Sequence, residues 1–583
     1  MQLLHLAIPH FRNLREVVIE FATRLSLGPH ALTEATEKSI RTHALIGQNG
    51  TGKSNLIEAL ITIFRDVDLD REVALDYTLE YEIRGRRVRI QGDRAKQKRP
   101  FVWVNGKSES QGYLLRNREL LPSHIFAYYS GRNERIEALF QEHQRRFNQR
   151  QELTTDEVLP QRLLDNFTAS DADIQDIEEI RRRREARLRQ AGDDRLRRLF
   201  YCRGGHSQLV LLACLLSDDP VFQKVLKNLH IESLESALFV LKEPYRLREK
   251  RRAGRFDEND LTEGDPRFWF ARGNVVSEFL DKLWQVAWAP IEQEAIRQID
   301  FRGRSESQRQ LYLFVPSHAK LRQLGELAGG IDSFFRYAEG AYIGDLIEEV
   351  RITVKKRDEH GGKVSFTQLS EGELQILTVL GLMRITREDD CLFLLDEPDT
   401  HLNPIWKLRY FDDIEGVLGA DAAAKESSGS QIVITTHDPM MVGSLKREQV
   451  HIIRRHGDRT TVDMPDEHPQ GMGVTGLLKS ELFGLSSTLD AETERRLFRR
   501  NELFVQPSRT PEEDEELTRL SAELADLGFS TADFRDPDYA MFVRKMAQHR
   551  RFRKPVLTPE EQAEQDEIAD QIINEILEKE GKR

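Results

Sequence analysis

The chain has 583 residues, of which 39% are hydrophobic and 32% are charged, a composition typical of a soluble globular protein. Its net charge of -12 excludes a molecule that is basic throughout. No apolar run reaches the length of a membrane span, and the first residues lack the pattern of a secretory signal. The isolated cysteines Cys202, Cys214 and Cys391 have no metal-ligand spacing. We therefore expect a cytoplasmic protein with no membrane partner.

Basic residues nevertheless gather in three places along the chain. Arginines crowd residues 181–198, and two further clusters lie at residues 246–255 and 550–554. Such clusters are most often solvated helix faces. A track for the phosphate backbone of a nucleic acid is the alternative, which the sequence leaves open.

Short strands and turns open the chain. Strands are predicted at residues 3–8 and 17–21, with the turn Phe-Arg-Asn-Leu at residues 11–14 between them. Residues 77–90 alternate in polarity on both sides of an Arg-Gly-Arg turn, which predicts a β-hairpin with one solvent-facing side. An apolar run at residues 124–129 predicts a buried strand.

Between these strands lies the sequence Gly-Gln-Asn-Gly-Thr-Gly-Lys-Ser at residues 47–54, which matches the phosphate-binding loop pattern G-x-x-x-x-G-K-[ST]. A helix is predicted directly after it, at residues 53–64. The N–H groups of the loop and the positive end of the helix would face one anion. Lys53 is the expected ligand of the β- and γ-phosphates, and Ser54 is the expected ligand of a magnesium ion. The other residues expected to contact the nucleotide are Asn49, Gly50, Thr51, Gly52 and Asn55.

The pattern changes between residues 146 and 300, where helical periodicity and charged residues predominate. Strand character returns at residues 310–315. After about residue 465 the chain again has the pattern of several helices, and the last of them carries isoleucines on one face at residues 568–576. That face is either a protein-docking surface or an intramolecular contact.

Four elements follow one another in the second half of the chain. The first, Leu-Ser-Glu-Gly-Glu at residues 369–373, opens an apolar-periodic helix, and by itself it is also a common helix-capping sequence. The second is an apolar run that ends on Asp396 and Glu397, and the third is the loop at residues 399–404 directly after it. The fourth is a buried strand that ends on His437.

Each element is common by itself, but their order downstream of a phosphate loop resembles the ATP-binding-cassette ATPases. That resemblance implies a chain that binds ATP and Mg²⁺ and hydrolyses ATP. Asp396 would hold the Mg²⁺ ion together with Ser54. Glu397 would orient or deprotonate the attacking water, and His437 would contact the γ-phosphate from the opposite side.

The resemblance also implies that a second copy completes the site. Ser370 and the N–H groups around Gly372 would close on the γ-phosphate held by Lys53 of another copy. The expected assembly is therefore a homodimer that sandwiches ATP, or a higher oligomer. The turn at residues 11–14 resembles the RecF, SMC and overcoming-lysogenization-defect branch, in which the arginine contacts nucleotide, and this makes Arg12 a predicted nucleotide ligand.

The sequence departs from the family pattern in three respects. The family usually places a glutamine after the strand at residues 124–129, linking the metal site to a helical insertion, and here Asn133 or Ser130 would have to replace it. The signature sequence has Glu371 and Glu373 where the family has glycine and glutamine. No aromatic residue that would stack on adenine is identified.

Three longer segments, residues 199–207, 396–406 and 480–490, resemble the PtuA-type ATPases of bacterial Septu and retron antiphage systems. This resemblance implies an ATPase that senses infection and gates a separate HNH-type effector nuclease, with DNA or RNA as a candidate partner. The chain shows no nuclease motif of its own. Asp536 and Asp538 form a D-x-D sequence, but no apolar strand precedes it, so we expect that this chain is not itself a nuclease.

Three rival functions remain open at this point. A RecF/SMC-like DNA-repair ATPase would bind DNA directly. An adaptor would bind ATP and barely hydrolyse it. A transporter subunit would need a membrane partner, against which stand the large insertion and the turn at residues 11–14.

Together these patterns predict an α/β P-loop ATPase of the ATP-binding-cassette type with a helical insertion and a helical C-terminal tail. An ATPase N-lobe with the phosphate loop would comprise residues 1–145, and the helical insertion residues 146–300. An ATPase C-lobe with the signature, the carboxylate pair and the histidine would comprise residues 301–465. Residues 466–583 would form the tail that docks a partner.

Overall fold

The chain divides into two compact units, Met1–Phe483 and Gly484–Arg583. The arginine-rich stretch before residue 198, the D-x-D sequence and the isoleucine face lie outside the described residues. The computed structural model describes residues 1–21, 40–131, 133–151, 198–202, 204–256, 264–271, 274–298, 305–357, 362–385, 390–419, 429–485, 488–506 and 508–527.

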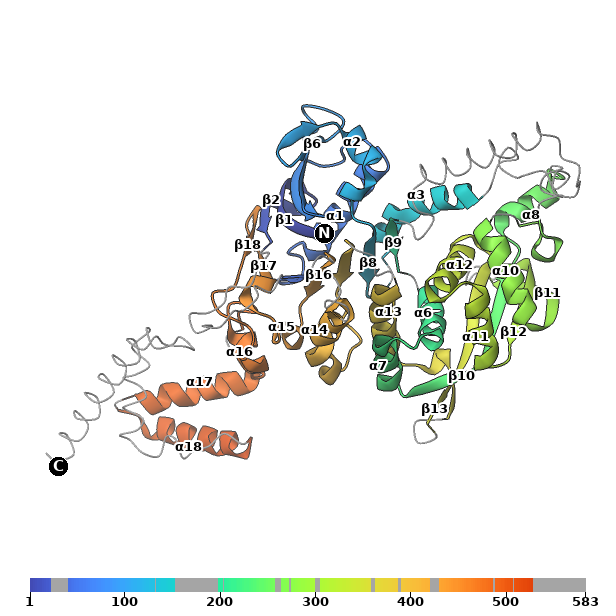
Figure 1. Cartoon of the computed structure of the whole chain (residues 1–583). Helices are drawn as coiled ribbons and strands as arrows, with labels where there is room; N and C mark the ends of the chain where they lie inside the picture. Colours follow the sequence, from blue (N-terminus) through green and yellow to red (C-terminus); the bar gives the residue numbers. More distant parts are fainter. Residues whose placement is uncertain are drawn as a thin grey trace, which may run out of the picture. The chain divides into compact units, whose positions relative to one another are not determined.

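A seven-stranded sheet forms the centre of the first unit (Figure 1). All neighbouring strands in it are parallel except the edge strand β18, which pairs antiparallel with β17. The strands β3, β15 and β16 are buried along their whole length, as expected where both faces of a parallel sheet are covered. In order across the sheet the strands are β18 (Arg459–Asp463), β17 (Val450–His456), β3 (Thr42–Ile46), β16 (Gln431–Thr436), β15 (Leu392–Asp396), β8 (Ile125–Tyr129) and β9 (Leu199–Tyr201).

One face of this sheet packs on helix α1 (Lys53–Asp68), and a six-stranded antiparallel sheet lies beyond that helix. One core cluster combines the apolar face of α1 with side chains of both sheets, so the helix lies between them. The predicted hairpin at residues 77–90 is confirmed as β4 and β5. The strands, in sheet order, are β2 (Leu14–Glu20), β1 (Gln2–Phe11), β4 (Tyr77–Ile83), β5 (Arg86–Gly92), β6 (Phe101–Val104) and β7 (Lys107–Glu109).

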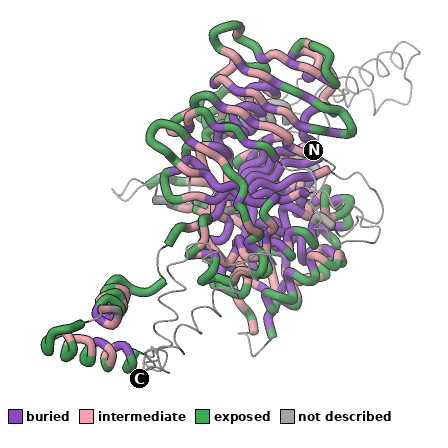
Figure 2. Tube along the Cα trace, turned by 90° about the vertical axis from the view of Figure 1, so that its left-hand side faces the viewer, coloured by how far each residue is buried: buried purple, intermediate pink, exposed green. Residues whose placement is uncertain are grey.

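Helices cover the other face of the central sheet, and their apolar side chains form the second core cluster. Buried chain is concentrated in the interior, and the exposed chain follows the outlying loops (Figure 2). These helices are α6 (Gly204–Leu216), α13 (Glu371–Ile385), α14 (Pro404–Gly419), α15 (Pro439–Val442) and α16 (Gly473–Lys479). Two other helices, α2 (Gln111–Arg116) and α3 (Glu134–Gln151), flank β8 in the sequence.

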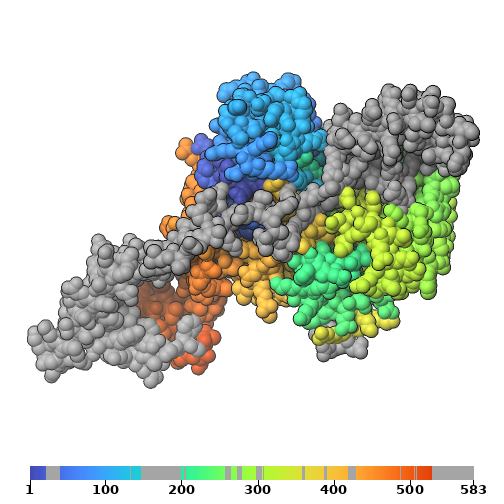
Figure 3. Space-filling view, viewed as in Figure 1, coloured from blue at the N-terminus to red at the C-terminus, as the bar shows by residue number. Residues whose placement is uncertain are grey.

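A five-stranded antiparallel sheet with its own helices forms a second lobe, which lies to one side of the central sheet in the space-filling view (Figure 3) and shares the core cluster of the helices described above. The predicted helical insertion at residues 146–300 contains strands as well as helices, because β9, β10 and β11 fall inside it. In sheet order the strands are β11 (Trp288–Gln298), β12 (Ser305–Val315), β10 (Ile231–Lys242), β13 (Ile347–Lys356) and β14 (Lys363–Ser365). The helices are α7 (Pro220–Asn228), α8 (Tyr245–Arg252), α10 (Asn274–Val286), α11 (His318–Leu327) and α12 (Ile331–Ile343).

The second unit contains helices α17 (Ala491–Val505) and α18 (Pro511–Asp526), which pack against each other. Asp490 caps the first helix, and Thr510 with Glu513 forms a capping box on the second. The helical pattern predicted for the tail is present in this part. The compact first unit nevertheless extends beyond the predicted boundary at residue 466, because Leu477 and Leu482 belong to its core.

A buried ion cluster ties α1 to α3 and to the start of β9. Asp68 accepts a hydrogen bond from Nε2 of His143 at 3.0 Å, and its other oxygen lies 2.9 Å from Nε of Arg198. Burial disfavours the charged carboxylate, but the His143 hydrogen bond and the Arg198 charge outweigh burial and lower the pKa of Asp68 to about 2.

We expect this cluster to make folding sensitive to acid. The pKa of an unfolded aspartate is about 4, so the stabilisation is complete above that pH and disappears as the pH falls toward 2. Asp68→Asn should lower the free energy of unfolding at pH 7 by about 2–3 kcal/mol and flatten its slope between pH 5 and 3. Urea unfolding at a series of pH values measures both effects. The exposed Asp70→Asn is the control, and an equal loss in that variant would contradict the assignment.

Candidate nucleotide-binding and catalytic site

The phosphate-loop sequence lies between β3 and α1, as predicted. Gly52 has φ of 108°, and a Cβ atom there would lie 2.4 Å from Cδ2 of Leu14, so only glycine fits. Among the described residues no side chain caps the N-terminus of α1, and its first turn has no acidic residue. The positive end of this helix is therefore directed at the loop without a competing internal anion.

Lys53 points back into the loop. Its Nζ donates to the carbonyl oxygens of Gly47 at 2.7 Å and Gln48 at 3.3 Å. Burial lowers the pKa of Lys53, and the negative charges of Glu397 and Asp396 oppose this shift. The lysine and the two carboxylates thus share one site. Of the other predicted loop residues, Thr51 donates from its hydroxyl to the Gln48 carbonyl at 2.9 Å, and Asn49 and Gly50 are exposed.

Asp396 is the buried end of β15, with 1% of its surface exposed. The Thr435 hydroxyl donates to its Oδ1, and the side chain of Ser54 forms a second hydrogen bond with the carboxylate. Burial raises the pKa of Asp396, and these hydrogen bonds only partly offset that shift. Oδ2 is buried without a hydrogen-bond partner among the described residues. An oxygen of this kind beside a serine hydroxyl suits Mg²⁺, which prefers hard oxygen ligands.

Glu397 follows in an unusual backbone conformation, with φ of 49°. Its backbone N–H donates to the Thr435 carbonyl at 3.1 Å, which anchors the residue to β16. Its Oε1 lies 3.2 Å from Nδ1 of His437, at the end of that neighbouring strand. Both side chains keep substantial exposure, so the carboxylate is oriented by an imidazole and still accessible to water.

The signature residues lie at the start of α13. Ser370 and Glu373 form a reciprocal capping box: the Ser370 N–H donates to Glu373 at 2.7 Å, and the Glu373 N–H donates to the Ser370 hydroxyl at 3.2 Å. Burial alone would raise the pKa of Glu373, but the hydrogen bond from Lys356 at 2.8 Å helps to lower it, which keeps the carboxylate ionised. A Cβ atom at Gly372 would lie 2.5 Å from the His401 carbonyl oxygen, so glycine permits close contact between α13 and the loop after β15.

Arg12 lies in the turn between β1 and β2, and its Nη2 is 2.6 Å from Oε1 of Glu58 on α1. Sequence reasoning missed a second arginine at this carboxylate. Nε of Arg135, in the first turn of α3, lies 3.1 Å from the other Glu58 oxygen. The only local signal for it was its place shortly after the strand at residues 124–129, where the family glutamine was sought.

The two candidates to replace that glutamine have different environments. Asn133 accepts from the N–H of Ile136 at 3.2 Å and so caps α3. The Ser130 N–H donates to the Asp396 carbonyl at 3.2 Å, and its hydroxyl is buried without a partner among the described residues. Ser130 is therefore the candidate that borders Asp396.

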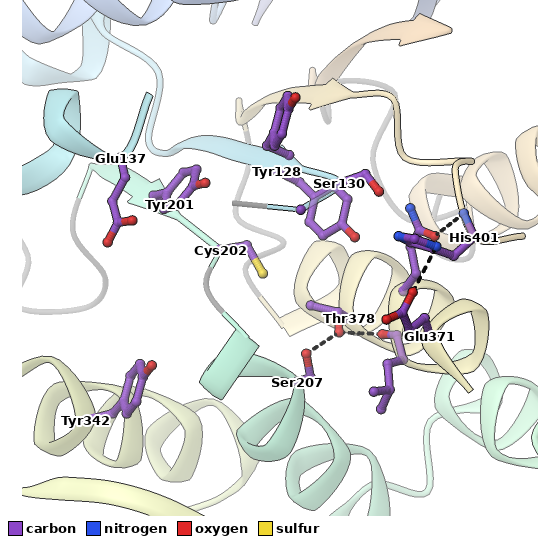
Figure 4. A pocket seen from close by; sticks show the side chains of 14 residues that line it. Tyr128, Ser130, Glu137, Tyr201, Cys202, Ser207, Tyr342, Glu371, Thr378 and His401 are labelled. Carbon is purple, nitrogen blue, oxygen red and sulfur yellow. Dashed lines mark hydrogen bonds and ion pairs between the residues drawn. The ribbon is translucent and has the colours of Figure 1, made fainter. Parts of the chain in front are cut away.

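A cavity of about 600 Å³ adjoins this site, lined by residues at the ends of β8 and β9 and on α3, α6, α12 and α13 (Figure 4). Glu371 and His401 form an ion pair of 3.0 Å at one side of it, and Thr378 donates to Ser207 at 2.8 Å at another. Because Ser130 also lines the cavity, the cavity wall reaches the end of β15 at Asp396. The remaining lining residues are Tyr128, Tyr129, Gly131, Glu137, Tyr201, Cys202, Tyr342, Leu374 and Gln375.

A phosphate-loop sequence after β3, a carboxylate pair at the end of β15 and a histidine after β16 give this α/β unit the arrangement of the P-loop ATPase fold class. Residues 230–442 match the family model described as "AAA domain, putative AbiEii toxin, Type IV TA system". The matched segment is less than half of the chain; it contains the signature, the carboxylate pair and His437 but not the phosphate loop.

Two solved structures with low sequence identity are similar to this chain in part. The SMC head domain from Thermotoga maritima is 12% identical, with 80% of this chain and 99% of that chain covered, at a TM-score of 0.29. A Bacillus cereus protein related to NIF3 is 11% identical, with 54% and 87% covered, at a TM-score of 0.10. No curated protein matches the sequence. Within the described part of the chain, none of the helices has the length and apolar character needed to cross a membrane.

Proposed function

We propose that this chain is an ATP-hydrolysing regulatory subunit that pairs with a second copy around ATP and gates a separate effector nuclease in antiphage defence. The observation that carries the ATPase assignment is that Lys53, Asp396 and Glu397 converge at the carboxyl ends of the central strands β3 and β15. Positioning and charge stabilisation are what phosphoryl transfer to water requires, and these residues supply both.

Each residue has a role that follows from its surroundings. Asp396 and Ser54 would hold Mg²⁺, which supplies charge neutralisation at the phosphates when it is bound. Lys53 would neutralise phosphate oxygens from the loop side. Glu397, oriented by His437 at 3.2 Å, would accept a proton from the attacking water.

The antiphage role rests on resemblance. The description of the matching family names a toxin of a toxin–antitoxin system, which is consistent with a bacterial defence function. The exposed start of α13 could close on a second copy, because the hydrogen bonds described for Ser370 remain within its own helix. An HNH-type nuclease is the proposed partner, and nucleic acid is the proposed target of the complex.

Direct DNA binding by this chain is the alternative. The basic helix α8 offers little support for it, since Arg251 pairs with Glu243 at 2.7 Å and Arg248 is largely buried. A steep loss of DNA binding with rising salt, measured on this chain alone, would favour the alternative.

A phosphate-release assay on the purified chain tests the proposed ATPase. We expect turnover that requires Mg²⁺ and stops when EDTA removes it. ATP binding without any turnover would instead support the adaptor. For the effector, the neighbouring reading frames should include a small HNH nuclease that copurifies with this chain, and a membrane permease in that position would displace the proposal.

A further inference from the structure

A chain of side-chain hydrogen bonds links the start of α3 to the phosphate loop. Nη2 of Arg135 donates to Oδ1 of Asn55 at 3.1 Å. Nδ2 of Asn55 donates to Oδ1 of Asn13 at 2.6 Å, and Nδ2 of Asn13 donates to the Gly50 carbonyl at 2.8 Å. The four residues come from α3, α1, the β1–β2 turn and the loop.

The donor-to-acceptor direction of this series of hydrogen bonds is fixed by the groups at its two ends. A guanidinium can only donate, and a backbone carbonyl can only accept. Each asparagine between them must therefore accept on its oxygen and donate from its nitrogen, so neither amide can turn over without breaking two bonds. The arrangement has a single hydrogen-bonded state, and that state defines the position of the Gly50 carbonyl.

The Gly50 carbonyl matters because a peptide unit is planar, with its C=O and N–H groups pointing in opposite directions. Holding the carbonyl toward Asn13 directs the N–H of Thr51 to the other side, where it donates to the Gln48 carbonyl at 3.3 Å and closes the turn of the loop. Gly50 has φ of 84°, and glycine has few steric restrictions, so without the hydrogen bond from Asn13 its backbone could adopt other conformations. A loop held in its binding conformation loses less entropy when it binds phosphate.

Glu58 holds Arg135, the first donor in this series of hydrogen bonds. It is 3% exposed and lies between Arg12 at 2.6 Å and Arg135 at 3.1 Å. A buried carboxylate needs at least one cation, and with Arg12 present it keeps one when Arg135 is removed. Loss of the Arg135 side chain should therefore release Asn55 without unfolding α1.

We propose that Arg135, Asn55 and Asn13 are positioning residues that couple the start of α3 to the nucleotide affinity of the phosphate loop. The inference rests on the proposed function, since it assumes that the loop binds ATP. Any change that moves α3 away from α1 would break the first bond and weaken ATP binding. By reciprocity, ATP would hold α3 in place.

The test uses the full chain and a fluorescent ATP analogue. Arg135→Ala and Asn13→Ala should each weaken binding about tenfold and raise KM, with kcat at saturation changed less than about threefold. The double variant Arg135→Ala/Asn13→Ala should bind ATP about as tightly as either single variant, because each substitution alone already breaks the same series of hydrogen bonds. Arg135→Lys, which can still donate to Asn55, should restore part of the affinity.

Arg71→Ala is the matched control. Arg71 lies 3.9 Å from Glu142 on α3 and has the same 43% side-chain exposure as Arg135, but its contact is far from the loop along α3. This variant should bind ATP normally. Equal weakening by Arg71→Ala, additive effects in the double variant, or unchanged binding by Arg135→Ala would overturn the coupling. Failure of the unmodified chain to bind ATP would instead overturn the proposed function.

Discussion

Replacing Glu397 with glutamine is expected to leave ATP bound and reduce its hydrolysis at least about 100-fold. Glutamine keeps the size and polarity of the side chain but cannot take a proton from water. Lys53, Ser54 and Asp396 are untouched, so binding of ATP and Mg²⁺ should persist. Phosphate release measures the rate, and the nucleotide retained after gel filtration measures the binding.

The exposed Glu20→Gln, on the six-stranded sheet, serves as the control and should hydrolyse ATP normally. His437→Ala should have a smaller effect than Glu397→Gln, since an imidazole that orients the carboxylate is one step removed from the proton transfer. Normal hydrolysis by Glu397→Gln would assign the reaction to another residue.

Mixing two inactive variants is expected to restore hydrolysis if the sites are shared between copies. Lys53→Ala removes the phosphate ligand, and Ser370→Arg blocks the start of α13. A mixed dimer would contain one site with both defects and one intact site. In an equal mixture half of the dimers are mixed, so about a quarter of the original activity should return.

Each variant measured alone, at the same total concentration, provides the baseline for this experiment. An equal mixture that stays inactive, although the two variants form dimers by light scattering, would mean that each chain completes its own site. The proposal of an ATP-sandwich dimer would then fail, while the assignments of Lys53 and Asp396 would stand.

The central sheet and the residues at its edge could be predicted because their signals are local. The phosphate loop is set by glycines within eight residues, and β15 and β16 are continuous apolar runs that end on polar side chains. The parallel register places Asp396 beside Thr435, which brings the ends of the two strands together. Patterns of this kind need no knowledge of distant contacts.

The five-stranded sheet had no comparable signal. Strand β10 pairs with β12 and β13, more than sixty residues farther along the chain, and its sequence lacks strict alternation. Its identity as a strand depends on those partners. Arg135 was missed for a similar reason, because its contacts with Asn55 and Glu58 form only when α3 folds back on α1.

The capping box at α13 has a consequence for how long two copies would stay together. The N-terminus of this helix already holds an anion of its own, the Glu373 carboxylate, balanced by Lys356. An incoming triphosphate would meet a helix end whose positive potential is partly cancelled. The two copies would then associate with a small gain in free energy and separate quickly. Rapid separation suits the proposed subunit, which would have to release its partner copy after hydrolysis.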